Sequence, residues 1–439
     1  MRVLFGLLAL LPLSSCMTVG SELAERHKPT AVSMTLWLDA SGKPMPFARY
    51  LVRAAEAIWS SRWKFPGESY DIRRARVELI SPKEWPRRPG CDASNTEGVL
   101  LMHGLTDSPF LMRDLGDFFD QLPGCMLIRS LLLPGHATTP GDLARVDYMH
   151  WVAAAQYGID QFNGAATRVH VVGFSTGGAL AIYWAYKQSA LSVPLASLIL
   201  MSPAIQPTGM IARLNILPHV AAKVAKLTGL GEWLDVFADQ DYAKYESFHL
   251  NAGYQIYRLD KVLKNYLGSP LSVPLFIALS RDDATINSQD TVRFFLLTTN
   301  TANRMILIAP DKENELVKQA LTDSRVTYIS AHVEDEKVIN FAHTSFVVNP
   351  ENPHYGRNGD YADCLHYAKK EKDKNKYCDC VTPQMSAPQC TVKGSSMIVY
   401  GEHDKKSVEE NVLRRLTFNP RFTAMTDEIR KFLAGAARP

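Results

Sequence analysis

The sequence predicts an α/β protein with a mainly parallel central sheet and helices on both of its faces. Short apolar runs typical of buried strands alternate with stretches whose apolar residues recur at helical spacing. Parallel strands are usually joined by crossover helices, so this alternation favours a parallel sheet. A Gly-x-Ser-x-Gly pentapeptide also lies between a strand-like and a helix-like segment. Strands are expected at 76–80, 98–102, 126–131, 169–174, 197–202, 274–280, 304–309 and 326–331.

Helices are expected before, between and after these strands. In the segment 47–63, Leu51, Ala54, Ala55 and Ile58 recur at helical spacing. Helical patterns also cover 151–162 and 290–297, and a last one at 422–433 is expected to pack on the sheet. We therefore expect an N-terminal tether and helix at residues 16–70, followed by one α/β domain at residues 71–439.

Two long segments interrupt the alternation of strands and helices. Residues 206–270 separate two core strands by several times the usual length of a connection. We interpret them as a mostly helical cap insertion, whose aromatic residues mainly pack the cap itself and only in part line a pocket. These aromatic residues are Trp233, Phe237, Tyr242, Tyr245, Phe248, Tyr254, Tyr257 and Tyr266.

The second interruption, 350–395, is hydrophilic and contains four cysteines, Cys364, Cys378, Cys380 and Cys390. With Cys91 and Cys125, six cysteines follow Cys16. An even number suggests disulfides if the chain is exported, as the signal-like residues 1–15 described below indicate. Cys91 and Cys125 each precede an expected strand, so they can lie at the same end of a parallel sheet. A zinc site formed by the four clustered cysteines, with or without His366, is an alternative, although their spacing fits no standard zinc module.

The pentapeptide Gly173-Phe174-Ser175-Thr176-Gly177 is the most informative motif in the chain. A sharp turn between a strand and a helix exposes a serine hydroxyl above the sheet, in a strained backbone conformation. Glycine is needed at 173 and 177, because side chains there would collide where strand and helix nearly touch. The pattern therefore predicts a nucleophile elbow with Ser175 as the nucleophile.

Backbone N–H groups must stabilise the negative charge that develops when a serine attacks a carbonyl. One is expected from Thr176, directly after the nucleophile, and the other from Leu105, in the loop after the strand at 98–102. His103 and His136 precede the serine in the sequence and are interpreted as residues that support these loops.

A serine nucleophile needs a base, and the base needs an orienting acid. Asp282 and Asp283 follow the strand after the cap, and only one can face the histidine because neighbouring side chains alternate in direction. His343 is the preferred base, since it follows an apolar approach and precedes small polar residues. His332, at the end of the strand at 326–331, is the alternative; His366 and His403 are interpreted as surface residues.

These motifs together resemble the α/β-hydrolase superfamily, and most closely its bacterial carboxylesterases and monoacylglycerol lipase or lysophospholipase-like enzymes. The segments that carry the resemblance are His103-Gly104-Leu105-Thr106, Leu133-Pro134-Gly135-His136, the pentapeptide at 173–177, Asp283-Ala284-Thr285-Ile286 and Ala342-His343. The resemblance covers about residues 75–350 and the final helix. The N-terminal segment to about residue 70 and the cysteine-containing insertion have no counterpart in minimal members.

The resemblance implies the α/β-hydrolase fold with a helical cap, and a triad in the chain order Ser175, Asp283, His343. Asp283 is preferred to Asp282 because an aspartate three residues before an aliphatic residue matches the family pattern. The implied reaction is ester hydrolysis through an acyl-enzyme, with no metal and no cofactor. A lipid or other apolar acyl ester is the expected substrate. Acyl transfer, amide hydrolysis and a binding role without catalysis are the alternatives.

Residues 1–15 resemble a bacterial lipoprotein signal peptide. Met1 and Arg2 precede an apolar run at 3–13 that is too short to span a membrane, and two serines precede Cys16. By that resemblance Cys16 is lipidated and anchors the protein to a membrane. Met17 favours the outer membrane, with the protein facing the periplasm. An ordinary signal peptide with an incidental cysteine is the alternative.

The overall charge is close to balanced. The chain has 48 Lys and Arg against 45 Asp and Glu, which gives a formal net charge of +3. No bulk charge therefore indicates a nucleic-acid partner.

Overall fold

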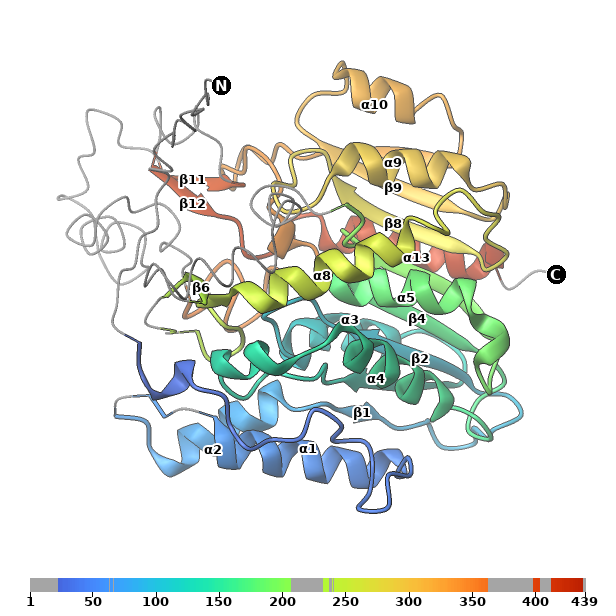
Figure 1. Ribbon diagram of the computed structural model, residues 1–439. Coiled ribbons are helices and arrows are strands. Elements are labelled where there is room, and N and C mark those ends of the chain that lie inside the picture. The colour runs from blue at the N-terminus through green and yellow to red at the C-terminus, as the bar shows by residue number, and fades with distance from the viewer. Residues whose placement is uncertain are drawn as a thin grey trace, which may run out of the picture.

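The computed structural model describes residues 23–62, 64–65, 67–206, 232–236, 239, 241–361, 398–402 and 412–436. Its centre is an eight-stranded sheet in the order β1-β3-β2-β4-β5-β8-β9-β10 (Figure 1). Neighbouring strands are parallel except at the edge, where β1 runs antiparallel to β3. The predicted α/β class with a mainly parallel sheet is confirmed.

All but one of the expected strands are present, because their apolar runs are the buried core of the sheet. β4 is buried along its whole length, as expected for a strand covered on both faces. The edge strand β1 Glu84–Trp85 is not among the expected ones. The other strands of the sheet are β2 Glu97–Met102, β3 Met126–Leu131, β4 Val169–Phe174, β5 Leu195–Met201, β8 Leu275–Ser280, β9 Arg304–Ala309 and β10 Val326–Ser330.

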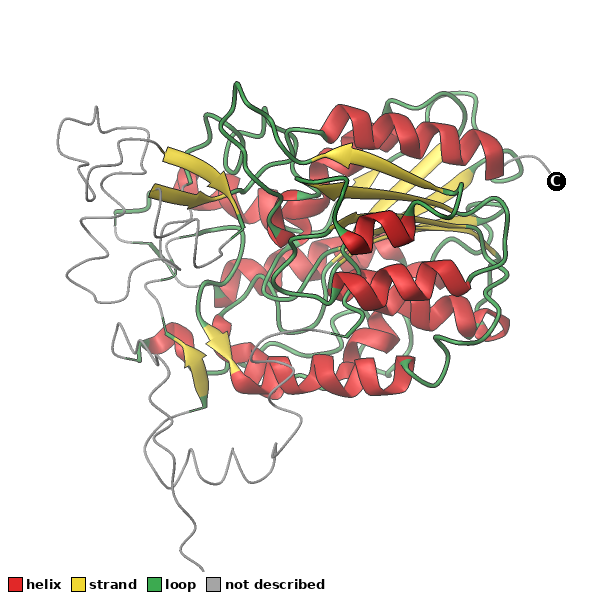
Figure 2. Cartoon of the chain, turned by 90° about the horizontal axis from the view of Figure 1, so that it is seen from above, coloured by secondary structure: helices red, strands yellow, loops and turns green. Residues whose placement is uncertain are grey.

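Helices cover both faces of the sheet, as the view from above shows (Figure 2). α4 and α5 contact the strands β2 to β5, and the C-terminal α13 contacts β5, β8 and β9. The described helices are α1 Phe47–Ser61, α2 Tyr70–Ile80, α3 Arg113–Asp120, α4 Tyr148–Asp160, α5 Thr176–Tyr186, α8 Leu250–Leu263, α9 Ser288–Leu297, α10 Glu315–Ala320 and α13 Phe422–Ala436. Among the described residues, no helix is long and apolar enough to cross a membrane.

The expected strand at 76–80 is wrong, because these residues form the last turns of α2. The hydroxyl of Ser69 caps this helix by accepting a hydrogen bond from the N–H of Ile72 at 3.3 Å. Arg73, Val77 and Ile80 are its buried residues, and their spacing of four and three is helical. The apolar residues within 76–80, from which the strand was expected, form one face of an amphipathic helix that packs on α1.

The structure describes the predicted cap and the cysteine-containing insertion only in part. The described part of 206–270 contains the antiparallel pair β6 Trp233–Asp235 and β7 Phe248–His249, followed by α8. After the insertion, β11 Ile398–Gly401 and β12 Val412–Arg415 form a separate parallel sheet and do not join the central one. Cys16, Cys364, Cys378, Cys380, Cys390, His366 and His403 lie outside the described residues.

A disulfide joins Cys91 to Cys125, with the two Cα atoms 5.6 Å apart. The backbone N–H of Glu97, at the start of β2, donates to the carbonyl oxygen of Cys125 at 2.9 Å. The disulfide therefore links the segments that lead into the neighbouring strands β2 and β3. The two cysteines lie at the same end of the sheet, as the sequence predicts.

Candidate active site

Ser175 lies at a sharp turn between β4 and α5. Its φ of +50° and ψ of −112° are rare for a residue with a side chain and place the backbone under strain. A Cβ atom on Gly177 would lie 2.2 Å from the carbonyl oxygen of Met102, and one on Gly173 would lie 2.5 Å from the backbone of Gly177. Both glycines are therefore required by the close approach of strand, helix and neighbouring loop.

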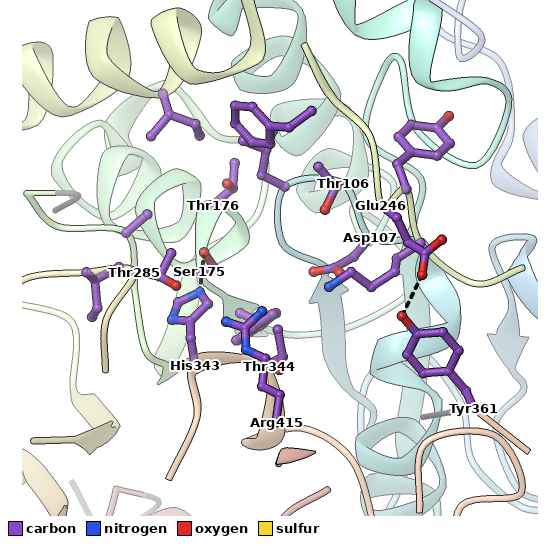
Figure 3. A pocket seen from close by; sticks show the side chains of 18 residues that line it. Thr106, Asp107, Ser175, Thr176, Glu246, Thr285, His343, Thr344, Tyr361 and Arg415 are labelled. Atoms are coloured by element: carbon purple, nitrogen blue, oxygen red, sulfur yellow. Dashed lines mark hydrogen bonds between the residues drawn. The ribbon is translucent and has the colours of Figure 1, made fainter. Parts of the chain in front are cut away.

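Ser175, His343 and Asp283 form a continuous hydrogen-bonded chain (Figure 3). The Nε2 atom of His343 is 3.0 Å from the Oγ of Ser175, and its Nδ1 atom is 2.6 Å from the Oδ2 of Asp283. The three residues are less than 10% exposed, so water competes weakly for these bonds. This is the arrangement in which a histidine can take a proton from a serine while a carboxylate orients it.

The structure distinguishes between the two adjacent aspartates. The second carboxyl oxygen of Asp283 accepts the N–H groups of Thr285 at 2.8 Å and Ile286 at 3.0 Å, which fixes the side chain toward His343. Asp282 instead pairs with the guanidinium of Arg281. Of the two, only Asp283 reaches His343.

Two other described histidines that follow Asp283 in the sequence, His332 and His354, have different partners. His332 is exposed, and its carbonyl oxygen accepts a hydrogen bond from Arg421 at 3.0 Å. His354 pairs with Asp241 at 2.9 Å and with Asp360, and those partners raise its pKa to about 9 despite its burial. Neither residue hydrogen-bonds Ser175.

His103 joins two loops that lie beside Ser175. Its Nδ1–H donates to the carbonyl oxygen of Gly104 at 2.8 Å, and its Nε2 accepts from the N–H of Leu133 at 3.1 Å. Burial and the neighbouring His136 hold the pKa of His103 well below its usual value, so the ring is neutral and can accept as well as donate. Leu105 and Thr176, the residues expected to supply the oxyanion donors, both line the cavity that contains Ser175.

No motif or spacing in the sequence indicates Glu402, which bonds the backbone of His343. The Oε2 atom of Glu402 accepts the N–H of His343 at 2.9 Å. Its own N–H donates to the side chain of Asn340 at 2.6 Å, and its Oε1 atom accepts from Arg415 at 3.2 Å. Glu402 directly follows β11, on the far side of a long insertion, so no local spacing relates it to Ser175, Asp283 and His343.

The cavity above Ser175 has an apolar part and a polar part. Its apolar lining is Leu105, Phe174, Ala204, Phe248, Ile256 and Ile286. Its polar lining includes Thr106, Asp107, Lys244, Glu246, Tyr361 and Arg415. The segment expected to form a cap thus contributes to both parts. Two of its predicted aromatic residues, Tyr245 and Phe248, reach the cavity.

Comparison with known proteins identifies the family. Residues 99–319, just over half of the chain, match the model of the Alpha/beta hydrolase family, and the chain belongs to this family. A thermostable monoacylglycerol lipase of Bacillus sp. (strain H-257) is 33% identical over 88 residues, which are 20% of this chain and 34% of the lipase. The chain thus matches about a third of the length of this curated relative.

Two solved structures can be superposed on part of the chain at low sequence identity. A structure described with LipS and LipT, two metagenome-derived lipolytic enzymes, has 19% identity and a TM-score of 0.39, with 56% of this chain and 88% of that chain covered. A soluble variant of monoglyceride lipase from Saccharomyces cerevisiae has 14% identity and a TM-score of 0.40, with 56% and 89% covered.

Proposed function

We propose that this protein is a serine hydrolase of carboxylic esters, with Ser175 as nucleophile, His343 as general base and Asp283 as orienting acid. The observation that carries the proposal is the hydrogen-bonded chain from Ser175 Oγ through His343 to Asp283, at 3.0 and 2.6 Å. Membership of the Alpha/beta hydrolase family supports hydrolysis as the reaction class.

In the proposed reaction, Ser175 Oγ attacks the acyl carbonyl while His343 Nε2 takes the hydroxyl proton. The N–H groups of Leu105 and Thr176 stabilise the oxyanion. The ester C–O bond then breaks, His343 returns the proton to the leaving alcohol, and the acyl group stays on Ser175. Water, activated by His343, releases the acid in a second addition and elimination. Asp283 accepts the Nδ1–H throughout and stabilises the charged ring.

The proposed substrate is a lipid or another apolar acyl ester. Support comes from the apolar lining, in which Ile256, Ile286 and Phe248 surround the space next to the nucleophile. The partial match to a monoacylglycerol lipase agrees with this class. The proposed location is the cell envelope, with a lipid on Cys16 that anchors the chain to the outer membrane. That part rests on the sequence of residues 1–17 alone.

The test is hydrolysis of p-nitrophenyl esters from acetate to palmitate by the purified protein, its Ser175→Ala variant and a control, Ser130→Ala. Ser130 is also buried, but it bonds Lys83 at the sheet edge. Turnover that is lost only in Ser175→Ala, with a fluorophosphonate adduct on Ser175, is the expected result. Turnover that survives in Ser175→Ala contradicts the proposal. Ester products formed with an added alcohol would instead indicate acyl transfer by the same residues.

A further inference from the structure

Asp107 is a buried carboxyl group that the proposed reaction does not use. Only 3% of this residue is exposed, and it lines the same cavity as Ser175. Figure 3 shows its side chain on the side of the cavity where Glu246 and Tyr361 lie, across from Thr285. It is part of the loop that contains Leu105, so it lies close to the place where the ester would be bound.

Asp107 has no hydrogen bond or ion pair with any of the residues that the structure describes, in contrast to the other buried aspartates. Each of those accepts at least one hydrogen bond: Asp142, Asp239, Asp241, Asp260 and Asp283. Burying a carboxylate without a partner costs several kcal/mol, so a purely structural aspartate is normally bonded. Burial accordingly raises the pKa of Asp107 to about 6, although the positive charge of Lys244 opposes this rise.

The surroundings of Asp107 form a distinct polar end of the cavity. A smaller cavity adjoins the main one, and both are lined by Asp107, Lys244, Thr344 and Tyr361. Glu246 is also at this end, where it accepts a hydrogen bond from the hydroxyl of Tyr361 at 2.8 Å. An apolar acyl chain gains nothing from these groups, whereas a polar alcohol group would satisfy them.

We propose that Asp107 accepts a hydrogen bond from a hydroxyl or protonated amine in the alcohol part of the ester, so that the enzyme selects esters of polyols or amino alcohols over plain alkyl esters. This inference rests on the proposed ester hydrolysis. A site built to bond a substrate donor discriminates strongly against an analogue without it, because its own buried group is then left unpaired.

The test compares three esters of butyric acid whose alcohols differ only in the group offered to Asp107. The 2-hydroxyethyl ester has a donor, the 2-methoxyethyl ester has none, and the choline ester has a positive charge but no donor. The protein is expected to have a kcat/KM about 10- to 100-fold higher for the hydroxyethyl ester than for the methoxyethyl ester. Asp107→Leu is expected to bring that ratio to within about twofold of one.

Two further variants keep the test decisive. Asp107→Asn preserves the shape of the side chain but replaces a charged acceptor with a neutral one, so the ratio should fall only in part. Asp160→Asn alters an aspartate that bonds the exposed Ser192 and should leave the ratio as it is. Labelling of each variant by a fluorophosphonate establishes that it is folded.

The outcomes separate this inference from the proposed function. Two results would overturn the role of Asp107 and leave ester hydrolysis intact. The first is hydrolysis of p-nitrophenyl butyrate together with a hydroxyethyl to methoxyethyl ratio of kcat/KM near one. The second is an unchanged ratio in both Asp107 variants. Preference for the choline ester over the hydroxyethyl ester also overturns the inference, because that cation has no hydrogen to donate. Failure to hydrolyse p-nitrophenyl butyrate would instead contradict the proposed function itself.

Discussion

Glu402 Oε2 accepts the backbone N–H of His343 at 2.9 Å, and this bond ties the segment after the long insertion to the proposed general base. Glu402 is 3% exposed and directly follows β11, which lies outside the central sheet. The small sheet of β11 and β12 therefore contacts the loop that carries His343 through a buried, charge-assisted hydrogen bond.

Glu402→Ala is expected to lower kcat for p-nitrophenyl butyrate by about 10- to 100-fold, because it removes a charged acceptor that fixes the His343 backbone. KM should change little, since Glu402 is not among the residues that line the cavity. Steady-state kinetics of Glu402→Gln, which keeps an acceptor oxygen, should show partial recovery. The control is Glu84→Ala, which breaks a Glu84–Arg129 pair at the sheet edge. An equal loss of kcat in both alanine variants would contradict a positioning role for Glu402.

The two adjacent aspartates provide a second test. Asp283→Asn should reduce kcat by about 10³- to 10⁴-fold, because the amide no longer favours the tautomer and charge of His343 that the reaction needs. Asp282→Asn should stay within about threefold of the unmodified protein, since its carboxylate pairs with Arg281 rather than with the histidine. Measured kcat values in the reverse order would show that the acid has been assigned to the wrong residue.

Gly177 is expected to tolerate no side chain. In Gly177→Ala the new methyl group would meet the Met102 carbonyl oxygen at 2.2 Å, so the backbone must shift. We expect a loss of about 2–4 kcal/mol in the free energy of unfolding, together with loss of activity. Gly268→Ala is the matched control, because nothing lies within 4 Å of its new atom. Urea denaturation of both variants checks the prediction, and similar midpoints would contradict it.

Asp107 should make the protein less stable as the pH rises. With its pKa raised to about 6, the folded state holds a proton that the unfolded state releases near pH 4. The stability contributed by this group therefore falls between about pH 4 and 6, and the full penalty is present above pH 6. Asp107→Asn removes the penalty and should add up to about 3 kcal/mol at pH 8, but little at pH 4. Thermal unfolding of Asp107→Asn and the unmodified protein at the two pH values measures this difference. A less stable Asp107→Asn variant at pH 8 would show that the carboxylate has a stabilising partner.

The sequence predicts most of the fold because its signals are local. Each core strand is a run of apolar residues, and the elbow at Ser175 is defined by five consecutive residues. The error at 76–80 has a local cause too, since the last turns of an amphipathic helix contain enough apolar residues to resemble a strand. The spacing of Arg73, Val77 and Ile80 would have identified the helix.

The polar features of the site depend on contacts between distant segments and could not be predicted in this way. Glu402 reaches His343 across 59 positions of sequence. Asp107 is three residues beyond Gly104 in an ordinary loop, and only its burial without a partner distinguishes it from a surface aspartate. Lys244 and Tyr361, which share its end of the cavity, come from the two long insertions.

The most direct test of the proposed function is mass spectrometry of the protein after reaction with a fluorophosphonate, beside Ser175→Ala and Ser130→Ala. One adduct on the peptide that contains Ser175 is expected in the unmodified protein and in Ser130→Ala, and none in Ser175→Ala. The adduct should form together with complete loss of p-nitrophenyl ester hydrolysis. An unlabelled Ser175 in protein that still hydrolyses these esters would contradict the assignment of the nucleophile.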